Sequence, residues 1–532
     1  MLRINQLKLP IHHSEEELKE KIFKILKVNG DQIVNYKISK QSIDARKKPT
    51  LFYVYTIDVQ VYHEKEVLRK SLQNVMIYEE KTYIIPKKMD KKSDTRPIII
   101  GFGPTGIFSA YLLAKCGLNP LVLERGADVD TRIKDVEAFW KGNLLNPNSN
   151  VLFGEGGAGT FSDGKLNTLV KDKFGRNQFV LKTLVEHGAP AEILYEQKPH
   201  IGTDILAQVV RRIRKSIETF GGEICFHTKV TDIFRKNPAD DLTVQTSRKD
   251  YITDTVILAI GHSARDTFEM LYERGVPMLA KSFAVGLRIE HHQTLINESQ
   301  YGISHDVLPP ASYKLAEQLD NGRGVYSFCM CPGGYVVNAS SEKNRLVVNG
   351  MSYYKRDGKN ANSAIVVTVT ENDYENDHPL SGMEFQRRLE ERAYQMGNGK
   401  IPVQRFADFC EKQITVALGD VQPNIKGQWQ FADLNQIFPK EIQESLKQGI
   451  LRMDQKIKGF ANQDALLSGV ESRTSSPVKI SRDVFFESGI KGIYPCGEGA
   501  GYAGGITSAA MDGMKVAEVV IHNYQVRDWV KQ

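Results

Sequence analysis

The chain lacks the features of an exported or disulfide-stabilised protein. Its 532 residues include only six cysteines, at positions 116, 225, 329, 331, 410 and 496, and no CxxC pair. The start of the chain has no apolar stretch of the kind that signal peptides carry. We therefore expect no structural disulfides and a cytoplasmic location.

Long hydrophobic runs are scarce as well. Residues 97–114 are uncharged and just reach the length at which a membrane span is considered. Gly101, Gly103, Pro104 and Gly106 divide this segment into a short strand, a turn and a helix. The sequence therefore predicts a soluble protein with no membrane partner.

Metal-ligand spacing is absent from the sequence too. His291 and His292 end a predicted strand, and no cluster of histidines, cysteines and carboxylates surrounds them in the sequence. No metal site is predicted.

Positive charge is concentrated at the N-terminus. The formal net charge is +6. Residues 1–96 contain 20 Lys and Arg against 13 Asp and Glu, whereas the remainder contains 50 against 51. The basic excess therefore marks a distinct N-terminal module. At ~150 residues per domain, the length predicts about three or four domains.

The N-terminal module is predicted to be a small α/β unit. Residues 3–9 alternate as a strand does. Residues 14–28 carry apolar residues at helical spacing behind a capping box of Ser14 and Glu17. Residues 51–63 are typical of a strand rich in aromatic and β-branched residues.

Beyond a polar linker at 87–96, helical and strand patterns continue along the chain. An amphipathic helix is predicted from Asp204 to the glycines at 221 and 222. Further strands are expected at 223–227, 230–235, 242–247, 251–260, 283–291, 324–331, 334–340, 345–351 and 364–370, and further helices at 383–395 and 441–446.

A glycine-rich turn follows the apolar strand at 98–100 and precedes a helix. Gly101 permits the tight turn, Gly103 lets the backbone approach a pyrophosphate, and Gly106 lets the helix pack closely on the strand. The helix N-terminus offers free N–H groups to that pyrophosphate. A second strand ends in Glu124, whose carboxylate can accept hydrogen bonds from an adenosine ribose and repels a 2′-phosphate. This pattern predicts a dinucleotide site and disfavours NADP.

Two later segments favour FAD over NAD. A buried strand ends in Gly261, and the strand within GIYPCGEG ends in Gly497 and Glu498. An extended FAD needs an acid for its ribitol hydroxyls, for which Glu498 is the candidate. It also needs positive potential beside the flavin, which the helix beginning near Gly505 and Ile506 would supply.

These segments resemble the glutathione-reductase-type FAD superfamily. They are RPIIIGFGPTGIFSAYLLAKCGLNPLVLERG, TVILAIG and GIYPCGEGAGYAGG. With GEGGAGTFSDGKLNT, AIGHSARDTFEML, GVYSFCMCPGGYVVNAS and SGVESRTSSPVKI, the whole chain resembles bacterial FAD-dependent dehydrogenases often labelled NAD(FAD)-utilising dehydrogenases, whose substrate is unsettled. The resemblance implies a FAD domain built from two separated segments around a strand-rich substrate domain. It transfers no catalytic residue.

The predicted fold class is α/β, with a two-segment Rossmann-type FAD-binding domain, an inserted strand-rich α+β substrate domain and a small N-terminal α/β module. The module is expected at 1–92, the two FAD-binding segments at 93–275 and 465–532, and the substrate domain at 276–464. The predicted contacts of a non-covalent FAD are Gly101, Gly103, Pro104, Thr105, Gly106, Glu124, Arg125, Thr160, Val230, Gly261, Gly497, Glu498, Gly505 and Ile506.

A second GxGxxG sequence at 154–159 is not expected to form a second nucleotide site. Ser162, Asp163 and Gly164 interrupt the helix that should follow, and no strand with a terminal acid comes at the right distance. We expect a loop that folds over the FAD, with Thr160 as a contact. The chain thus lacks the second Rossmann domain of the disulfide reductases, and it also lacks their CxxxxC pair.

Several other residues allow two interpretations. Cys329 and Cys331 either face the flavin as thiols or are structural residues on one face of a strand, and the structural interpretation is favoured. His262 either relays protons or is satisfied within a turn, and the turn is favoured. Arg265 and Asp266 are expected to pair locally.

The run Arg473–Ser476 either meets substrate or FAD, or forms a structural turn. The sequence as a whole favours an FAD-dependent oxidoreductase that exchanges hydride with an organic small molecule. Either NAD(P)H is the external donor or an electron carrier reoxidises the flavin, and the sequence chooses neither. It also leaves the oligomeric state open.

Other functions are less favoured. A flavin-dependent RNA-modifying enzyme would use the basic module, with Phe52, Tyr53 and Tyr55 stacking on bases. A solvated basic face with core aromatics explains the same residues more simply. A flavin redox sensor is a third option. A flavin monooxygenase is disfavoured because its usual Asp-Gly motif is absent after Gly261.

Overall fold

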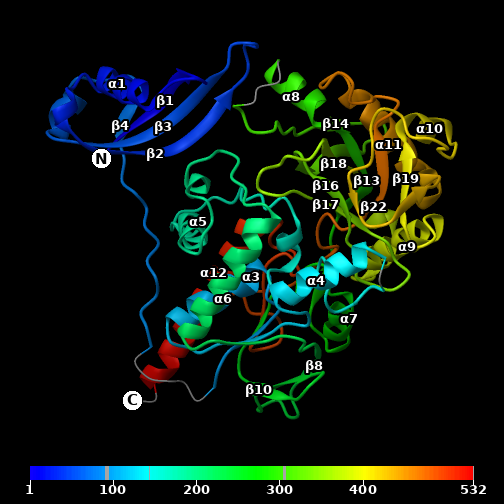
Figure 1. Ribbon diagram of the computed structural model, residues 1–532. Helices are drawn as coiled ribbons and strands as arrows, with labels where there is room; N and C mark the ends of the chain where they lie inside the picture. Colours follow the sequence, from blue (N-terminus) through cyan, green and yellow to red (C-terminus); the bar gives the residue numbers. More distant parts are fainter. Residues whose placement is uncertain (90–94, 143, 303–306, 375, 531–532) are drawn as a thin grey trace.

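The computed structural model describes residues 1–89, 95–142, 144–302, 307–374 and 376–530 (Figure 1). The strands of these residues form six sheets, and the helices pack around them in a mixed α/β structure. The predicted linker at 87–96 lies partly outside the described residues. Within the described part of the chain, no helix combines the length and apolar character needed to span a membrane.

The N-terminal residues form an antiparallel sheet. Its strands, in spatial order, are β2 (Ile33–Asp44), β3 (Phe52–Val61), β1 (Leu2–Pro10) and β4 (Val75–Ile77). The helices of this part are α1 (Glu15–Leu26) and α2 (Glu64–Arg69). The capping box of Ser14 and Glu17 is present at the start of α1. The sequence analysis missed β2 because this edge strand has no fully buried residue and therefore little apolar alternation.

A parallel sheet joins segments from distant parts of the sequence. Its strands, in spatial order, are β24 (Ile493–Pro495), β11 (Val256–Leu258), β5 (Ile98–Ile100), β6 (Leu121–Leu123) and β7 (Glu223–Cys225). The helices α3 (Pro104–Lys115), α6 (Thr203–Thr219) and α12 (Ile506–Val530) lie side by side (Figure 1). Their apolar residues pack on the face that presents Ile99, Val122 and Ile257. Two further helices in this part of the chain are α4 (Val129–Trp140) and α5 (Arg176–Glu186).

The opposite face of the parallel sheet presents Ile98 and Ile100, as the period-two alternation of a strand requires. This face packs against α7 (Arg265–Glu273) and a sheet of β10 (Tyr251–Thr253), β9 (Leu242–Thr246) and β8 (Val230–Phe234). The single strand predicted at 251–260 is therefore two strands in two different sheets. The Thr253 hydroxyl bonds to the Arg96 and Thr255 carbonyls where the chain leaves one sheet for the other.

The predicted substrate domain at 276–464, together with residues 466–471 beyond its predicted end, forms a seven-stranded sheet, which lies at the right of Figure 1. Its strands, in spatial order, are β14 (Ala316–Gln318), β15 (Gly324–Cys331), β18 (Asn360–Val369), β13 (Phe283–His292), β22 (Leu466–Glu471), β19 (Ile401–Arg405) and β21 (Trp429–Phe431). Its helices are α8 (Gln293–Tyr301), α9 (Ser381–Met396), α10 (Phe406–Glu411) and α11 (Lys440–Met453).

Two small sheets complete the fold. They are β17 (Val348–Met351), β16 (Tyr335–Asn338) and β20 (Ile425–Lys426), and the pair β12 (Met278–Ala280) and β23 (Val478–Ile480). The N-terminal sheet contacts the body through backbone hydrogen bonds. The Gln41 N–H donates to the Tyr195 carbonyl over 2.8 Å, and the Gln197 N–H donates to the Gln41 carbonyl over 2.9 Å.

Candidate functional site

A cavity of about 1080 Å³ lies between the parallel sheet and the seven-stranded sheet. Residues that follow β5, β6, β11 and β24 line one part, and residues of β15 and β22 line another. Ligands of open α/β sheets bind in such crevices outside the carboxyl ends of the strands. The volume is at the upper end, about 1,000 Å³, of ordinary small-molecule pockets, so an extended ligand has room here.

Most of the predicted cofactor contacts line this cavity. The eleven that do so are Gly101, Gly103, Pro104, Thr105, Glu124, Arg125, Val230, Gly261, Glu498, Gly505 and Ile506. Gly106 and Gly497 lie behind the wall instead. A Cβ at Gly106 would be 2.0 Å from the Gly101 carbonyl oxygen, and one at Gly497 would be 2.0 Å from Thr105 Oγ1. These two glycines therefore allow close packing.

The loop at 154–159 contacts the first glycine-rich turn. A Cβ at Gly157 would lie 2.9 Å from the Gly103 Cα, so the two backbones are in close contact. Thr160 is buried in the short 3₁₀ helix Gly157–Phe161 and donates to the Glu155 carbonyl over 3.3 Å. Its side chain is therefore not part of the cavity wall.

Gly103 is the N-cap of α3, and Pro104 is the first helical residue. A Cβ at Gly103 would meet no atom of the protein nearer than 3.6 Å. The fold alone therefore leaves room for a side chain at this position, in the cavity wall beside the helix N-terminus. A pyrophosphate that approaches the helix N-terminus needs the same room, because α3 presents its free N–H groups there.

The Glu124 carboxylate is fixed by three backbone groups. Oε2 accepts from the Phe102 N–H over 2.8 Å, and Oε1 accepts from the Gly126 and Gly154 N–H groups over 2.9 and 3.0 Å. An ionised carboxylate has about four acceptor positions, so one remains for a ligand hydroxyl.

Asp266 binds two cations beside this part of the cavity. Arg125 donates to both of its oxygens, over 3.0 and 2.6 Å, and Lys229 Nζ lies 2.6 Å from Oδ2. Burial would raise the pKa of Asp266, but Arg125 and Lys229 outweigh it and hold the pKa below its usual value. The predicted pairing of Arg265 with Asp266 is wrong. Consecutive helical side chains point about 100° apart, and Arg265 faces a different element.

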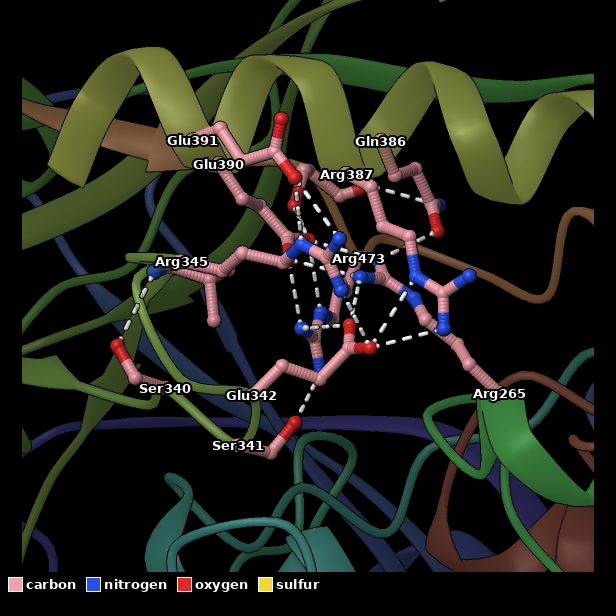
Figure 2. Close-up of polar contacts among 12 residues, drawn as sticks. Arg265, Ser340, Ser341, Glu342, Arg345, Gln386, Arg387, Glu390, Glu391 and Arg473 are labelled. Carbon is pink, nitrogen blue, oxygen red and sulfur yellow. Dashed lines mark hydrogen bonds and ion pairs between the residues drawn. The ribbon is translucent and has the colours of Figure 1, made fainter. Parts of the chain in front are cut away.

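Arg265 instead joins a buried ion-pair network, which Figure 2 shows. Its guanidinium donates to both oxygens of Glu390 on α9, over 2.8 and 2.7 Å, and it also pairs with Glu342. Arg473 donates to the same two Glu390 oxygens, over 2.9 and 2.7 Å, and to Ser341 Oγ over 2.6 Å. The network therefore connects α7 and α9 with the segment of Ser341 and Glu342 and with the segment of Arg473. It fixes Arg473 in the cavity wall.

The network also determines the charge of its central carboxylate. Burial alone would raise the pKa of Glu390. Arg265 and Arg473 outweigh burial and hold the pKa well below its usual value. Glu390 is therefore ionised at neutral pH, between the two guanidinium groups.

A second carboxylate on the cavity wall has the opposite environment. Burial raises the pKa of Glu498 to about 7, and Lys281, which also lines the cavity, only partly opposes this effect. Glu498 can therefore carry or release a proton near neutral pH. Gly505 and Ile506 line the same cavity, and α12 begins there with its positive end.

Among the described residues, three buried polar atoms of the cavity lining have no hydrogen-bond partner. They are His262 Nε2, Ser263 Oγ and Arg125 Nε. Burial, followed by repulsion from Arg473 and Arg265, lowers the pKa of His262 to about 4, so its imidazole is neutral at pH 7. Buried polar groups nearly always have partners. These residues therefore fit a bound group with many hydrogen-bonding atoms, as an FAD has.

The seven-stranded sheet contributes a buried ion pair that the sequence analysis missed. Arg288 Nη1 donates to Glu471 Oε2 over 2.9 Å, and Glu471 lines the cavity. Burial, only partly offset by Arg288, raises the pKa of Glu471. The signal was a charge inside each of the apolar strands FAVGLRIEH and LLSGVE.

The prediction that Cys329 and Cys331 lie on one face of a strand is wrong, because β15 has a register shift between Phe328 and Cys331. Cys329 adopts a positive φ of 46° there. Cys329 lines the cavity, whereas Cys331 is fully buried and bonds to the Cys329 carbonyl. Both thiols are free, and burial raises their pKa values. Residues in the described ranges include no group of three or more His, Cys, Asp or Glu that could hold a metal ion.

Comparison with known families agrees with this cofactor. Residues 282–474 match a family described as "FAD-dependent protein, C-terminal domain-like", and residues 1–60 match a domain of unknown function. The match covers about a third of the chain and supports FAD as the ligand of this part. The chain belongs to one family with an uncharacterized protein of Clostridium beijerinckii, to which it is 47% identical over 532 residues, or 99% of each chain.

The matches among solved structures are more distant. They include the halogenase PltM in complex with FAD (12% identity, TM-score 0.38, covering 82% of this chain and 71% of that one). They also include the E. coli quinol fumarate reductase FrdA (11%, 0.37, 81% and 70%) and a glycine oxidase of Bacillus cereus (12%, 0.33, 81% and 96%). Likeness at this level assigns neither a reaction nor a substrate.

Proposed function

We propose that this protein is an FAD-dependent oxidoreductase whose organic substrate binds in the same cavity, against the seven-stranded sheet. The observation that carries the proposal is the continuous lining of the cavity. It extends from Gly103 and Glu124 to Glu498 and Gly505, and on to β15 and β22. A redox cofactor in this cavity would therefore meet a second ligand without leaving it.

Each part of the wall has a role in this proposal. Gly103 and the N-terminus of α3 would bind the pyrophosphate, and Glu124 would accept from the ribose. Glu498 would bind the ribitol hydroxyls, and the positive end of α12 would stabilise negative charge beside it. FAD, when bound, supplies two-electron oxidation and reduction. His262 is neutral, and because its other ring nitrogen donates to the Arg473 backbone, Nε2 can accept a hydrogen bond without adding charge.

The domain boundaries are part of the same proposal. Residues 93–275 would form the first segment of the FAD-binding domain, and β24, which pairs with β11 in the parallel sheet, would belong to its second segment. The predicted boundary between 464 and 465 moves, because β22 (Leu466–Glu471) is a strand of the seven-stranded sheet. The substrate domain would therefore extend from 276 to the end of β22. The N-terminal residues would form a module that contacts the body near Tyr195.

An anaerobic titration tests this function and the electron donor. We expect the FAD-replete protein to lose its visible flavin absorption when NADH or NADPH is added, and to regain it when an organic acceptor is added. A protein that binds no FAD, or whose flavin reacts with no donor or acceptor of a broad panel, would contradict the proposal.

A further inference from the structure

Three lysines line the cavity on the side of the seven-stranded sheet. Lys165 follows the glycine-rich loop and bonds to Met330 of β15, Lys198 comes from the segment beside the N-terminal module and bonds to Ser312, and Lys314 lies between α8 and β14. Because they come from three separate segments, their placement in one cavity is a feature of the tertiary structure and of no sequence motif.

The partners of these lysines leave most of their charge uncompensated. Lys198 Nζ donates to the neutral hydroxyl of Ser312 over 3.0 Å, and Lys165 Nζ donates to the Met330 carbonyl. For Lys314, the described residues supply no hydrogen bond or ion pair. A hydroxyl and a carbonyl orient an ammonium group without neutralising it.

The nearby carboxylates are already paired with other cations. Asp163 accepts from Arg356 Nε over 2.9 Å and from Arg356 Nη2, and its Oδ2 is 3.9 Å from Lys165 Nζ. Glu471 accepts from Arg288. Asp163 thus offsets about one charge of the neighbouring cations, and the lysines keep a net positive field in this part of the cavity.

Repulsion within the cluster acts on Lys198. Burial of part of its side chain, and then the charges of Lys165 and Arg356, lower the pKa of its ammonium group. An anion bound among these groups would remove that repulsion. The neighbouring cavity wall contains the apolar residues Phe328 and Met330 beside Tyr313, so an organic body can lie next to the anionic group.

We propose that Lys165, Lys198 and Lys314 bind the carboxylate of an organic acid, which makes organic acid anions the substrate class of this oxidoreductase. This inference rests on the proposed function, because it describes the substrate end of the same cavity. Lysine supplies a mobile point charge rather than the planar fork of arginine, and the three side chains can therefore share one carboxylate.

Isothermal titration calorimetry of the FAD-replete protein tests this assignment without any turnover. The probes are sodium succinate, benzoate and octanoate, with inorganic phosphate as a non-carboxylate anion. The variant is the double substitution Lys198→Ala with Lys314→Ala, which leaves the Lys165 bond to the backbone intact. The matched control is Lys236→Ala, a lysine on the exposed hairpin between β8 and β9.

We expect at least one carboxylate probe to bind the wild-type protein and the Lys236→Ala protein alike. The double variant should bind it about 10-fold or more weakly, as expected when charge-assisted hydrogen bonds are lost. Added salt should weaken wild-type binding more than binding by the double variant.

Three results would overturn the inference. They are no binding of any carboxylate probe, equal binding by the double variant, and tighter binding of phosphate than of every carboxylate. The flavin absorption of each sample is measured first. Protein without FAD would contradict the proposed function, whereas FAD-replete protein that fails these titrations would contradict only the substrate class.

Discussion

The buried carboxylate of Glu390 holds Arg473 in place in the cavity wall. Its two oxygens accept from both Arg265 and Arg473, and Ser472 Oγ donates to Oε1 over 2.6 Å. Removing one partner of a buried pair leaves an uncompensated charge, and this costs more than the intact pair contributes.

Glu390→Gln should therefore lower the free energy of unfolding by about 3–5 kcal/mol. Urea denaturation measures this change. The matched control is Glu391→Gln on the next residue of α9, whose side chain is 43% exposed and pairs with Arg345. It should cost less than about 1 kcal/mol. Equal losses of unfolding free energy in the two variants would show that the buried network does not stabilise the protein more than an exposed ion pair does.

Glu498 should make stability depend on pH in the flavin-free protein. Burial raises its pKa from 4.5 to about 7, so the folded state binds more protons than the unfolded state between these values. The free energy of unfolding should therefore fall as the pH rises from about 4.5 to about 7. Glu498→Gln should flatten this slope, whereas Glu273→Gln, at an exposed position, should not. Urea denaturation at pH 5 and pH 8 compares the three proteins.

At the scale of elements, the junction of β5 and α3 combines two glycines with different roles, Gly103 at the N-cap and Gly106 in the first turn of the helix. A Cβ at Gly106 would clash with the Gly101 carbonyl at 2.0 Å, whereas one at Gly103 would meet only Gly157 Cα at 3.6 Å. The fold therefore requires a glycine at position 106 and tolerates a methyl group at position 103. The FAD pyrophosphate proposed to bind beside Gly103 would not leave room for that methyl group.

Two alanine variants separate these roles. Gly106→Ala should lower the free energy of unfolding of the flavin-free protein by roughly 1–3 kcal/mol, because the helix must shift away from the strand. Gly103→Ala should change that free energy by less than about 0.5 kcal/mol. It should nevertheless weaken FAD binding about 10-fold or more, as measured by fluorescence titration. A Gly103→Ala protein with normal FAD affinity would refute the role given to this turn.

At the scale of the whole molecule, the cavity connects parts of the chain that are far apart in sequence. Residues after β5, β6, β11 and β24 share its wall with β15 and β22. A ligand that binds only the folded state stabilises every element that must be in place to form its site. FAD binding should therefore be coupled to the folding of both sheets.

With free FAD at 100 times its dissociation constant, the free energy of unfolding should rise by about 2.7 kcal/mol. Hydrogen exchange should show slower exchange in β5 and α3 and also in β15 and β22. Protection confined to the residues around α3 would argue against a shared site.

The sequence determined the local parts of this protein. The β5–turn–α3 unit, the capping box of α1 and the short strand β24 follow from short-range rules of backbone sterics and periodicity. Most of the eleven predicted contacts line one cavity for a related reason, because they directly follow parallel strands whose carboxyl ends share an edge; Val230, in the antiparallel strand β8, and Gly505 and Ile506, at the start of α12, do not.

Tertiary structure alone decided the charged contacts. Arg265 pairs with Glu390 across 125 positions of the sequence, and Lys165, Lys198 and Lys314 line one cavity from three separate segments. The bulge that separates Cys329 from Cys331 also depends on how β15 pairs with β18. Such contacts form only when distant segments pack together, and residue spacing along the chain carries no signal for them.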